Sequence, residues 1–250
     1  MKYLKQFATP AAYEAAASSL IAPNVSLITD GSGKVMYMKE TPTPPTPTHE
    51  YVDLGLPSGT LWATMNLGAN SITDTGLYYQ WGDTQGYTYN EREWEDSTYK
   101  WYDAENDDYS KYNSTDGKLV LDNSDDAAIA AWGDGWHIPT KAQCVELINE
   151  DYVTTAWTTD YQGSGVKGLL ITSKENGNTL FLPANTEIGT EYERAVYQSN
   201  ATFDQYGKYS WFITIYSERY GPDITDENCE GEVYRAYGNG IRPVKDGQQY

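Results

Sequence analysis

The chain has 250 residues, of which 39% are hydrophobic, and a formal net charge of −19 at pH 7. Its length allows one sizeable core and a small additional module. Such an acidic surface repels nucleic-acid phosphates and anionic lipids, and the Lys and Arg residues are scattered, so we expect neither nucleic-acid binding nor membrane insertion.

The aromatic and cysteine content indicates what kind of protein this is. The chain contains 23 Tyr but only 4 Phe, and tyrosine suits exposed contact surfaces because its ring is apolar and its tip is polar. Its two cysteines, Cys144 and Cys229, indicate no disulfide framework. The N-terminus lacks the apolar stretch of a signal peptide, so we expect synthesis in a cytoplasm. These features favour recognition over catalysis.

Residues 1–40 are predicted to form a small helix-plus-hairpin module. Residues 9–20 begin with Thr-Pro, which is typical of a helix start, and continue with good helix formers. Residues 25–28 and 34–38 are predicted to be two strands around an Asp-Gly-Ser-Gly turn. A unit this small rarely folds alone, which favours a docking or oligomerisation module over the alternative of an unstructured leader.

Residues 41–50, TPTPPTPTHE, are predicted to be a stiff linker, because closely spaced prolines hold an extended polyproline conformation. The main domain is expected to follow at residues 51–250. This layout, with an anchoring piece, a spacer and a presented domain, is typical of fibres and adhesins.

The main domain is predicted to consist of short strands separated by long loops. Between residues 83 and 126, thirteen acidic residues stand against four basic ones and alternate with aromatic residues, which predicts surface excursions with little regular structure. Strands are predicted on both sides of a Pro-Ser-Gly turn within residues 51–63, and at residues 168–172 and 179–182. A short aromatic segment at residues 77–83 and three last segments, at residues 209–216, 232–237 and 240–244, complete the domain.

Residues 132–140, WGDGWHIPT, are predicted to be a tight loop that joins two helices, and we call this stretch the joint. Its two tryptophans, Trp132 and Trp136, are separated by Gly-Asp-Gly, which disfavours a helix and allows the positive φ of a turn. Before the joint, Ser124 is predicted to be the N-cap of a short helix.

After the joint, Thr140 and Gln143 have the spacing of a capping box, which predicts the start of a longer helix. Cys144, Val145 and Ile148 are expected to lie on the inner face of this helix.

Six ordered blocks of sequence resemble the Fibrobacter succinogenes major paralogous domain, which is widespread in Bacteroidetes proteins and their phages. The blocks are VDLGLPSGTLWA (52–63), YQWGD (79–83), LDNSDDAA (121–128), WGDGWHIPTKAQCVELI (132–148), FLPA (181–184) and GIRPV (240–244). The resemblance implies an α+β, C-type lectin-like domain with a small twisted antiparallel sheet, two helices and long loops. Formylglycine-generating enzymes and retroelement-diversified variable proteins share this fold.

Two positions depart from the family pattern. His137 stands where the family more often has Arg, and Cys144 stands where it often has an aromatic residue; we interpret both as altered packing. The N-terminal blocks TPAAYEAA and PNVSLITDGSGKVMY resemble leaders on virion proteins of Bacteroides-type phages, which implies a place on a virus particle.

Four tryptophans, Trp62, Trp81, Trp132 and Trp136, could line a sugar-binding groove. Tryptophans next to glycine in a segment that joins elements more often pack inward, so we predict core positions for them.

Asp122, Asp125 and Asp126 are candidate calcium ligands, because closely spaced carboxylates supply the oxygens that Ca²⁺ prefers. Helix capping explains the same residues without an ion, and we favour it. A second acidic loop at residues 223–230 is interpreted as solvated charge. The Glu-Pro-Asn and Trp-Asn-Asp signatures of calcium-dependent lectins are absent, and we expect no cofactor.

The sequence offers little for catalysis. Its two histidines, His49 and His137, lie in the linker and in the joint, so a catalytic triad would depend on His137 alone. Metal-binding spacings of the HxxxH or CxxC kind are missing. The formylglycine-generating relatives need two nearby cysteines in the C-terminal part, where only Cys229 stands. We therefore expect no enzyme.

The predicted binding face lies in residues 206–239, the part of the fold that carries the variable ligand-binding residues in retroelement-diversified relatives. Rigid rings and short polar groups make adaptable contact surfaces. The alternative is that these tyrosines pack on one another beneath loops. The candidate residues are Tyr206, Tyr209, Trp211, Tyr216, Ser217, Arg219, Tyr220, Tyr234, Tyr237 and Asn239.

Together these features predict a phage virion protein, a head or tail fibre or decoration protein, whose lectin-like domain faces outward and binds a host-surface glycan or protein. We expect a homo-oligomer, a trimer, that contacts other virion proteins through residues 1–40, since weak binding gains from multivalency. One alternative is an exported bacterial surface adhesin or pilus-tip-like protein, and a third is a formylglycine-generating-type enzyme.

Overall fold

The computed structural model describes residues 3–7, 24–29, 35–40, 49–185, 194–202, 208–216, 222–223 and 234–247. The chain divides into two compact units, Met1–Thr48 and His49–Tyr250, and the boundary falls within the predicted linker. Small sheets and two α-helices among the described residues make the protein α+β. No helix in the described ranges has the length and apolar character needed to cross a bilayer.

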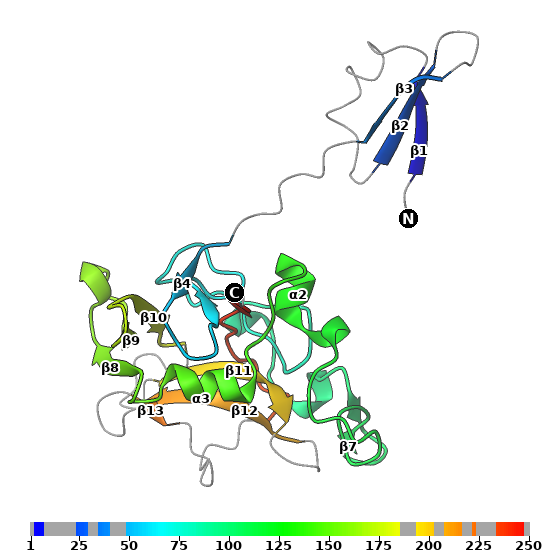
Figure 1. Ribbon diagram of the computed structural model, residues 1–250. Coiled ribbons are helices and arrows are strands. Elements are labelled where there is room, and N and C mark those ends of the chain that lie inside the picture. Colours follow the sequence, from blue (N-terminus) through cyan, green and yellow to red (C-terminus); the bar gives the residue numbers. More distant parts are fainter. Residues whose placement is uncertain are drawn as a thin grey trace. The chain divides into compact units, whose positions relative to one another are not determined.

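The first unit contains a three-stranded sheet (Figure 1). Strand β2 (Asn24–Thr29) lies in the middle, parallel to β1 (Tyr3–Phe7) and antiparallel to β3 (Val35–Glu40). The predicted hairpin is confirmed, whereas β1 was not predicted. The helix predicted at residues 9–20 lies outside the described residues.

The described residues of the second unit form four small antiparallel sheets, in the orders β14-β5-β4, β10-β9-β8, β11-β12-β13 and β6-β7. Their strands are β4 (Tyr51–Asp53), β5 (Leu61–Ala63), β6 (Tyr102–Asp103), β7 (Asp108–Tyr109), β8 (Val153–Thr158), β9 (Gly168–Ser173), β10 (Thr179–Pro183), β11 (Arg194–Thr202), β12 (Ser210–Tyr216), β13 (Pro222–Asp223) and β14 (Val244–Lys245).

The strands predicted within residues 51–63 and near residues 168–172 and 179–182 are confirmed, and the segment at residues 209–216 contains strand β12. Residues in the segments 77–83 and 234–237 form isolated β-bridges, from Tyr78 to Tyr87, Tyr79 to Asn239 and Tyr209 to Tyr234. Of residues 240–244, only Val244 belongs to a strand. Strands β8 and β11 were not predicted.

Helix α3 (Lys141–Leu147) contacts β11 and β12, and Figure 1 shows it lying along this sheet. The predicted capping box is confirmed: the Gln143 N–H donates to Thr140 Oγ1 at 3.2 Å, and the Thr140 N–H donates to Gln143 Oε1 at 2.9 Å. Cys144 and Leu147 are buried in the main core.

One predicted member of the inner face of α3 is wrong, because Val145 is 38% exposed. Cys144, Leu147 and Ile148 share a face at spacings of three and four residues, and Val145 is rotated from Cys144 by about 100° around the helix.

The short helix before the joint is α2 (Ala127–Trp132), and its N-cap is Asp126, not Ser124 as predicted. Ser124 lies in a preceding 3-10 turn, η4 (Asn123–Asp125). The buried Asp126 carboxylate accepts N–H bonds from Ala128 and Ile129, and its second oxygen accepts the Ile138 N–H at 2.9 Å. One carboxylate therefore starts α2 and fixes the far end of the joint.

The joint turns as predicted: Gly133 ends α2 with a φ of 87°, which a residue with a Cβ rarely adopts. Of the four tryptophans predicted to be buried, Trp62 and Trp81 are fully buried and Trp136 is nearly so. Trp132 is half-buried, and the His49 ring stacks on it with centroids 3.7 Å apart.

Residues 83–126 have little regular structure, as predicted, with only two short strands and three 3-10 turns: η2 (Tyr89–Glu91), η3 (Asp96–Thr98) and η4. The expectation that they are merely surface excursions is wrong. Tyr99, Tyr109 and Tyr112 are buried, because their rings pack against one another, against Trp81 and against a buried arginine.

Candidate functional site

The described part of the predicted binding face brings three tyrosine rings together, and we call Tyr209, Tyr234 and Tyr237 the tyrosine face. The rings of Tyr209 and Tyr234 lie 4.7 Å apart, and those of Tyr234 and Tyr237 lie 5.5 Å apart. Tyr237 is 47% exposed, whereas the other two are half-buried. The rings of these tyrosines pack on one another, and Tyr237 also exposes surface to solvent.

Other predicted members of the face lie elsewhere or are not described. Trp211 lies beneath the Lys141 ammonium of α3, which is 3.4 Å from its ring centroid. The prediction that Asn239 lies on the contact surface is wrong, because Asn239 is only 4% exposed. Its side chain donates to the Tyr237 carbonyl and so supports the loop that carries Tyr237. Tyr216 ends β12, with no side chain described. Outside the described residues are Tyr206, Ser217, Arg219 and Tyr220.

The backbone that carries Tyr234 and Tyr237 is tied to the body of the domain. The Trp81 N–H donates to the Arg235 carbonyl at 2.9 Å, and Gln80 Nε2 donates to the Ala236 carbonyl at 2.8 Å. Asn239 and Tyr79 exchange two backbone hydrogen bonds of 3.0 Å. The segment that carries Tyr234 and Tyr237 is therefore hydrogen-bonded to three residues of the YQWGD block.

Arg235 is the residue of this region that the sequence reasoning missed. Its side chain is fully buried between the rings of Trp81, Tyr99 and Tyr109, with the guanidinium carbon 4.6 Å from the Tyr109 centroid and 5.1 Å from that of Trp81. Arginine is rarely buried, so only its position between two predicted face residues could have drawn attention to it.

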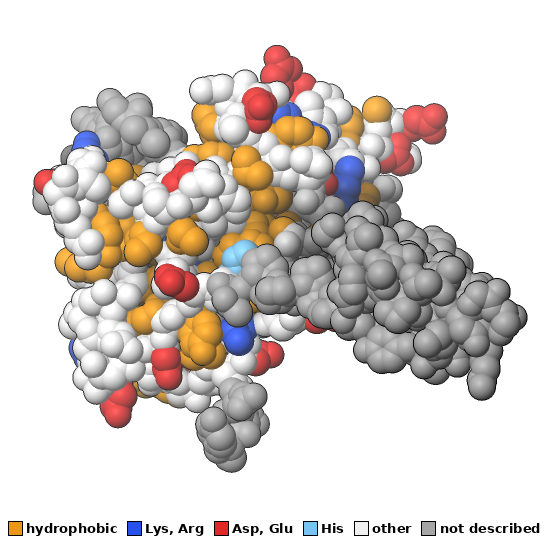
Figure 2. Space-filling view, turned by 90° about the horizontal axis from the view of Figure 1, so that it is seen from above, with side chains coloured by type: hydrophobic (Ala, Val, Ile, Leu, Met, Phe, Trp, Pro, Cys, Tyr) orange, Lys and Arg blue, Asp and Glu red, His pale blue; other side chains and the backbone are white. Residues whose placement is uncertain are grey.

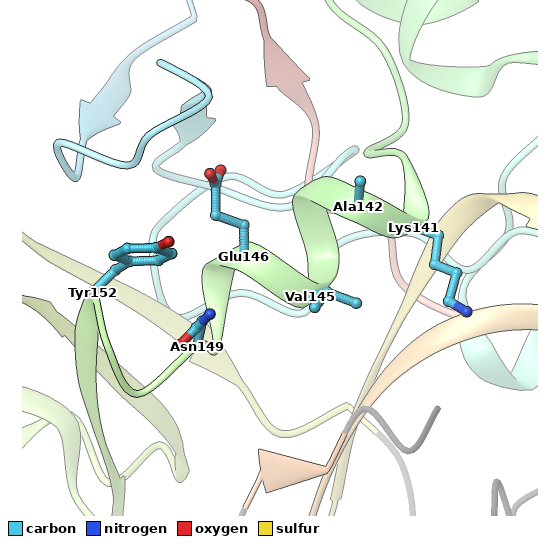
Figure 3. Close-up of a pocket in the computed structure, with 6 residues that line it drawn as sticks. All are labelled: Lys141, Ala142, Val145, Glu146, Asn149 and Tyr152. Atoms are coloured by element: carbon cyan, nitrogen blue, oxygen red, sulfur yellow. The ribbon is translucent and has the colours of Figure 1, made fainter. Parts of the chain in front are cut away.

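A second candidate surface runs along the exposed side of α3. It is an open groove of about 570 Å³, and Figure 3 shows Lys141 and Tyr152 at opposite ends of its lining. Val145 and Tyr152 contribute exposed apolar area. The sequence reasoning missed this groove because Val145 was assigned to the core. The lining residues are Lys141, Ala142, Val145, Glu146, Asn149 and Tyr152.

The surface charge seen in Figure 2 is mixed. Lys and Arg atoms lie on that face as separate spots between acidic side chains and hydrophobic atoms. A nucleic-acid surface would need basic residues gathered along one face.

The three aspartates considered as calcium ligands have protein partners. Lys111 Nζ contacts both Asp125 and Asp122, and Lys118 Nζ donates to Asp122 at 2.6 Å. Asp126 is the helix cap, as favoured, but Asp122 and Asp125 are held by lysines and do not cap α2. Within the described ranges, no group of three His, Cys, Asp or Glu side chains could hold a metal ion.

The contacts of the Asp125 carboxylate with Lys111 and Tyr112 are expected to weaken in acid. Burial opposes its charged form, but hydrogen bonds from Lys111 and Tyr112 outweigh burial and hold the pKa of Asp125 below its ordinary value of 3.8. A lowered folded-state pKa means that Asp125 stabilises the fold above about pH 4, and that this contribution is lost as the pH falls through the folded-state pKa.

Asp125→Asn is therefore expected to lower the free energy of unfolding at neutral pH by about 1–2 kcal/mol and to flatten its decline in acid. Urea unfolding at neutral pH and at about pH 3 measures both effects. Asp134→Asn, which alters an exposed carboxylate of the joint, is the matched control. An acid decline as steep in Asp125→Asn as in the parent chain would contradict this role.

The residues considered for catalysis have structural contacts. His137 Nδ1 donates to the Ile138 carbonyl at 2.9 Å, and its Nε2 lies 3.5 Å from an oxygen of Asp246. Cys144 is buried in the main core, and this burial raises the pKa of its thiol well above the ordinary value. Cys229 lies outside the described residues. Neither described group is an exposed, activated nucleophile.

No family model matches the chain, and neither a curated protein nor a solved structure matches it.

Proposed function

We propose that the chain is a phage virion structural protein, a head or tail fibre or decoration protein, that binds a host-surface glycan or protein through the tyrosine face. The observation that carries the proposal is the packed group of Tyr209, Tyr234 and Tyr237, with Tyr237 open to solvent. Rigid rings on a fixed backbone lose little conformational entropy on binding, which is why tyrosines dominate adaptable recognition surfaces.

The fold proposed for residues 51–250 is C-type lectin-like. Two short helices, small antiparallel sheets and long packed loops support it. The terminal strands also support it, because β14 near the C-terminus pairs with β5 near the start of the domain. In this arrangement the segments that carry Tyr209, Tyr234 and Tyr237 provide the recognition surface.

The proposed location on a virus particle rests on the order of the two units along the chain. The unit Met1–Thr48 precedes the domain across a proline-rich segment, as in a protein that anchors at one end and presents the other. Residues 1–40 would contact other virion proteins and form a homotrimer, which would multiply a weak binding interaction. An exported bacterial adhesin would use the same tyrosine face, and finding the chain in purified virions separates the two.

The tyrosine face is tested by binding of the full-length chain to whole cells of a panel of Bacteroides-type strains. Tyr237→Ala is expected to weaken binding to a recognised strain by about tenfold or more, because Tyr237 is the most exposed ring of the tyrosine face and aromatic rings are enriched among the hot spots of contact surfaces. The chain offers a matched control in Tyr152→Ala, since Tyr152 is 37% exposed but lies in the α3 groove.

Binding that survives Tyr237→Ala but is lost in Tyr152→Ala would move the site to the α3 groove. A failure to bind any strain of the panel would count against the function itself.

A further inference from the structure

We infer that Arg235 is the positioning residue of the tyrosine face: it clamps the loop that carries Tyr234 and Tyr237 to the aromatic segment around residues 99–112. Its effect on ligand binding rests on the proposed function, whereas the clamp itself does not.

The guanidinium makes the clamp through two main-chain carbonyls. Nη1 donates to the Tyr112 carbonyl and Nη2 donates to the Lys111 carbonyl, both at 3.1 Å. Tyr112 has a φ of 58°, an uncommon conformation for a residue with a side chain. The two carbonyls therefore belong to a sharp bend, and a planar fork is suited to holding two neighbouring acceptors at once.

Aromatic rings surround the cation where a carboxylate would be expected. Among the described residues no carboxylate lies within ion-pair distance of Arg235, and the rings of Tyr109, Trp81 and Tyr99 have centroids 4.6, 5.1 and 5.7 Å from its guanidinium carbon. Ring faces attract a cation, most strongly when water is excluded. Burial lowers the pKa of Arg235, and the guanidinium still remains charged near neutral pH.

The main chain of Arg235 extends the clamp to two further segments. Its N–H donates to the Lys208 carbonyl at 3.0 Å, and its carbonyl accepts the Trp81 N–H at 2.9 Å. Lys208 directly precedes Tyr209, whose ring packs on that of Tyr234. Arg235 thus joins both segments of the tyrosine face to the YQWGD block and to the bend at Tyr112.

Lysine cannot replace this arrangement, because its single ammonium carries no rigid fork to reach both carbonyls. Arg235→Lys retains the charge and removes the fork. If Arg235 positions the face, this change loosens residues 234–239 first; if it only contributes to overall stability, all segments loosen together.

Amide hydrogen exchange of the full-length chain distinguishes these results. Arg235→Lys is expected to speed exchange at residues 234–239 and 109–112 by about tenfold or more, and to leave β9 and β10 much less affected, because local opening is independent of global unfolding. Leu180→Ala is the control: it opens a cavity in the main core on β10 and should not selectively affect residues 234–239.

Tyr109→Leu provides a second variant if Arg235→Lys does not fold. It removes the ring that lies closest to the Arg235 guanidinium and leaves the arginine in place. The same local pattern of faster exchange is expected. Exchange at residues 234–239 that stays unchanged, or that rises equally with β9 and β10, would overturn the inference.

Binding to a recognised strain adds the functional readout. Arg235→Lys should weaken binding with Tyr237 still in place, whereas Tyr237→Ala should weaken binding without changing exchange at residues 109–112. If no strain binds the parent chain, the proposed function fails while the exchange measurement still decides the role of Arg235.

Discussion

Replacing Trp81 by alanine is expected to lower the free energy of unfolding of the second unit by about 4 kcal/mol, within the range for a fully buried tryptophan. Trp81 is inaccessible to solvent, its ring meets that of Tyr112 edge to face at 5.1 Å, and its Nε1–H donates to the Ser199 carbonyl at 2.8 Å. The change removes the ring, the hydrogen bond and one wall of the cage around Arg235.

Urea unfolding followed by the remaining tryptophan fluorescence measures this loss. Trp132→Ala is the matched control, because Trp132 is only half-buried and should cost clearly less. Equal losses in the two variants would contradict a central packing role for Trp81 beside Tyr112 and Arg235.

Replacing Arg242 by methionine is expected to cost about 3 kcal/mol or more, because the variant removes four hydrogen bonds, three of which are buried. Arg242 is fully buried, and burial lowers its pKa to about 10. Its guanidinium holds three segments together at 2.8–3.0 Å. The acceptors are Asn66 Oδ1 and the carbonyls of Ala63, Thr64 and Phe181.

Methionine keeps much of the side-chain volume, so the decrease in the free energy of unfolding reports lost hydrogen bonds more than lost packing. Removing a buried charge is itself favourable and offsets part of this decrease. Arg92→Met is the control: Arg92 is only half-buried and donates to the Thr98 carbonyl alone in the described structure, and we expect less than about 1.5 kcal/mol for it. A melting temperature unchanged by Arg242→Met would contradict a structural role for the GIRPV block.

Local signals explain which elements could be predicted from the sequence. The hairpin of β9 and β10 has a turn rich in Asn and Gly, with Gly177 at a φ of 75°, and α3 begins at a capping box that involves only Thr140 and Gln143. Turns and caps are short-range interactions, so the sequence alone specifies them.

Strand β11 could not be predicted because it is buried on both faces, so no alternation of polar and apolar residues marks it. It even places Gln198 and Ser199 in the interior, where their groups serve other segments: the Gln198 amide donates to the Tyr79 carbonyl, and the Ser199 carbonyl accepts from Trp81. Such long-range pairing leaves no pattern within the strand itself.

For the candidate site, the sequence could predict only the region of the chain, from its abundance of tyrosine. Tyrosine abundance drew attention to residues 206–239, but it could not separate Tyr237, which is exposed, from Asn239, which supports the loop from beneath. The buried arginines Arg235 and Arg242 were missed for the same reason, since their burial depends on rings and carbonyls distant in the sequence.

The most direct test of the account is a hydrogen-exchange footprint of the full-length chain with surface polysaccharide purified from a recognised strain. We expect protection at residues 208–211 and 234–239 and no change at residues 141–152. Protection confined to residues 141–152, with the tyrosine face unchanged, would contradict the assignment of ligand binding to Tyr209, Tyr234 and Tyr237.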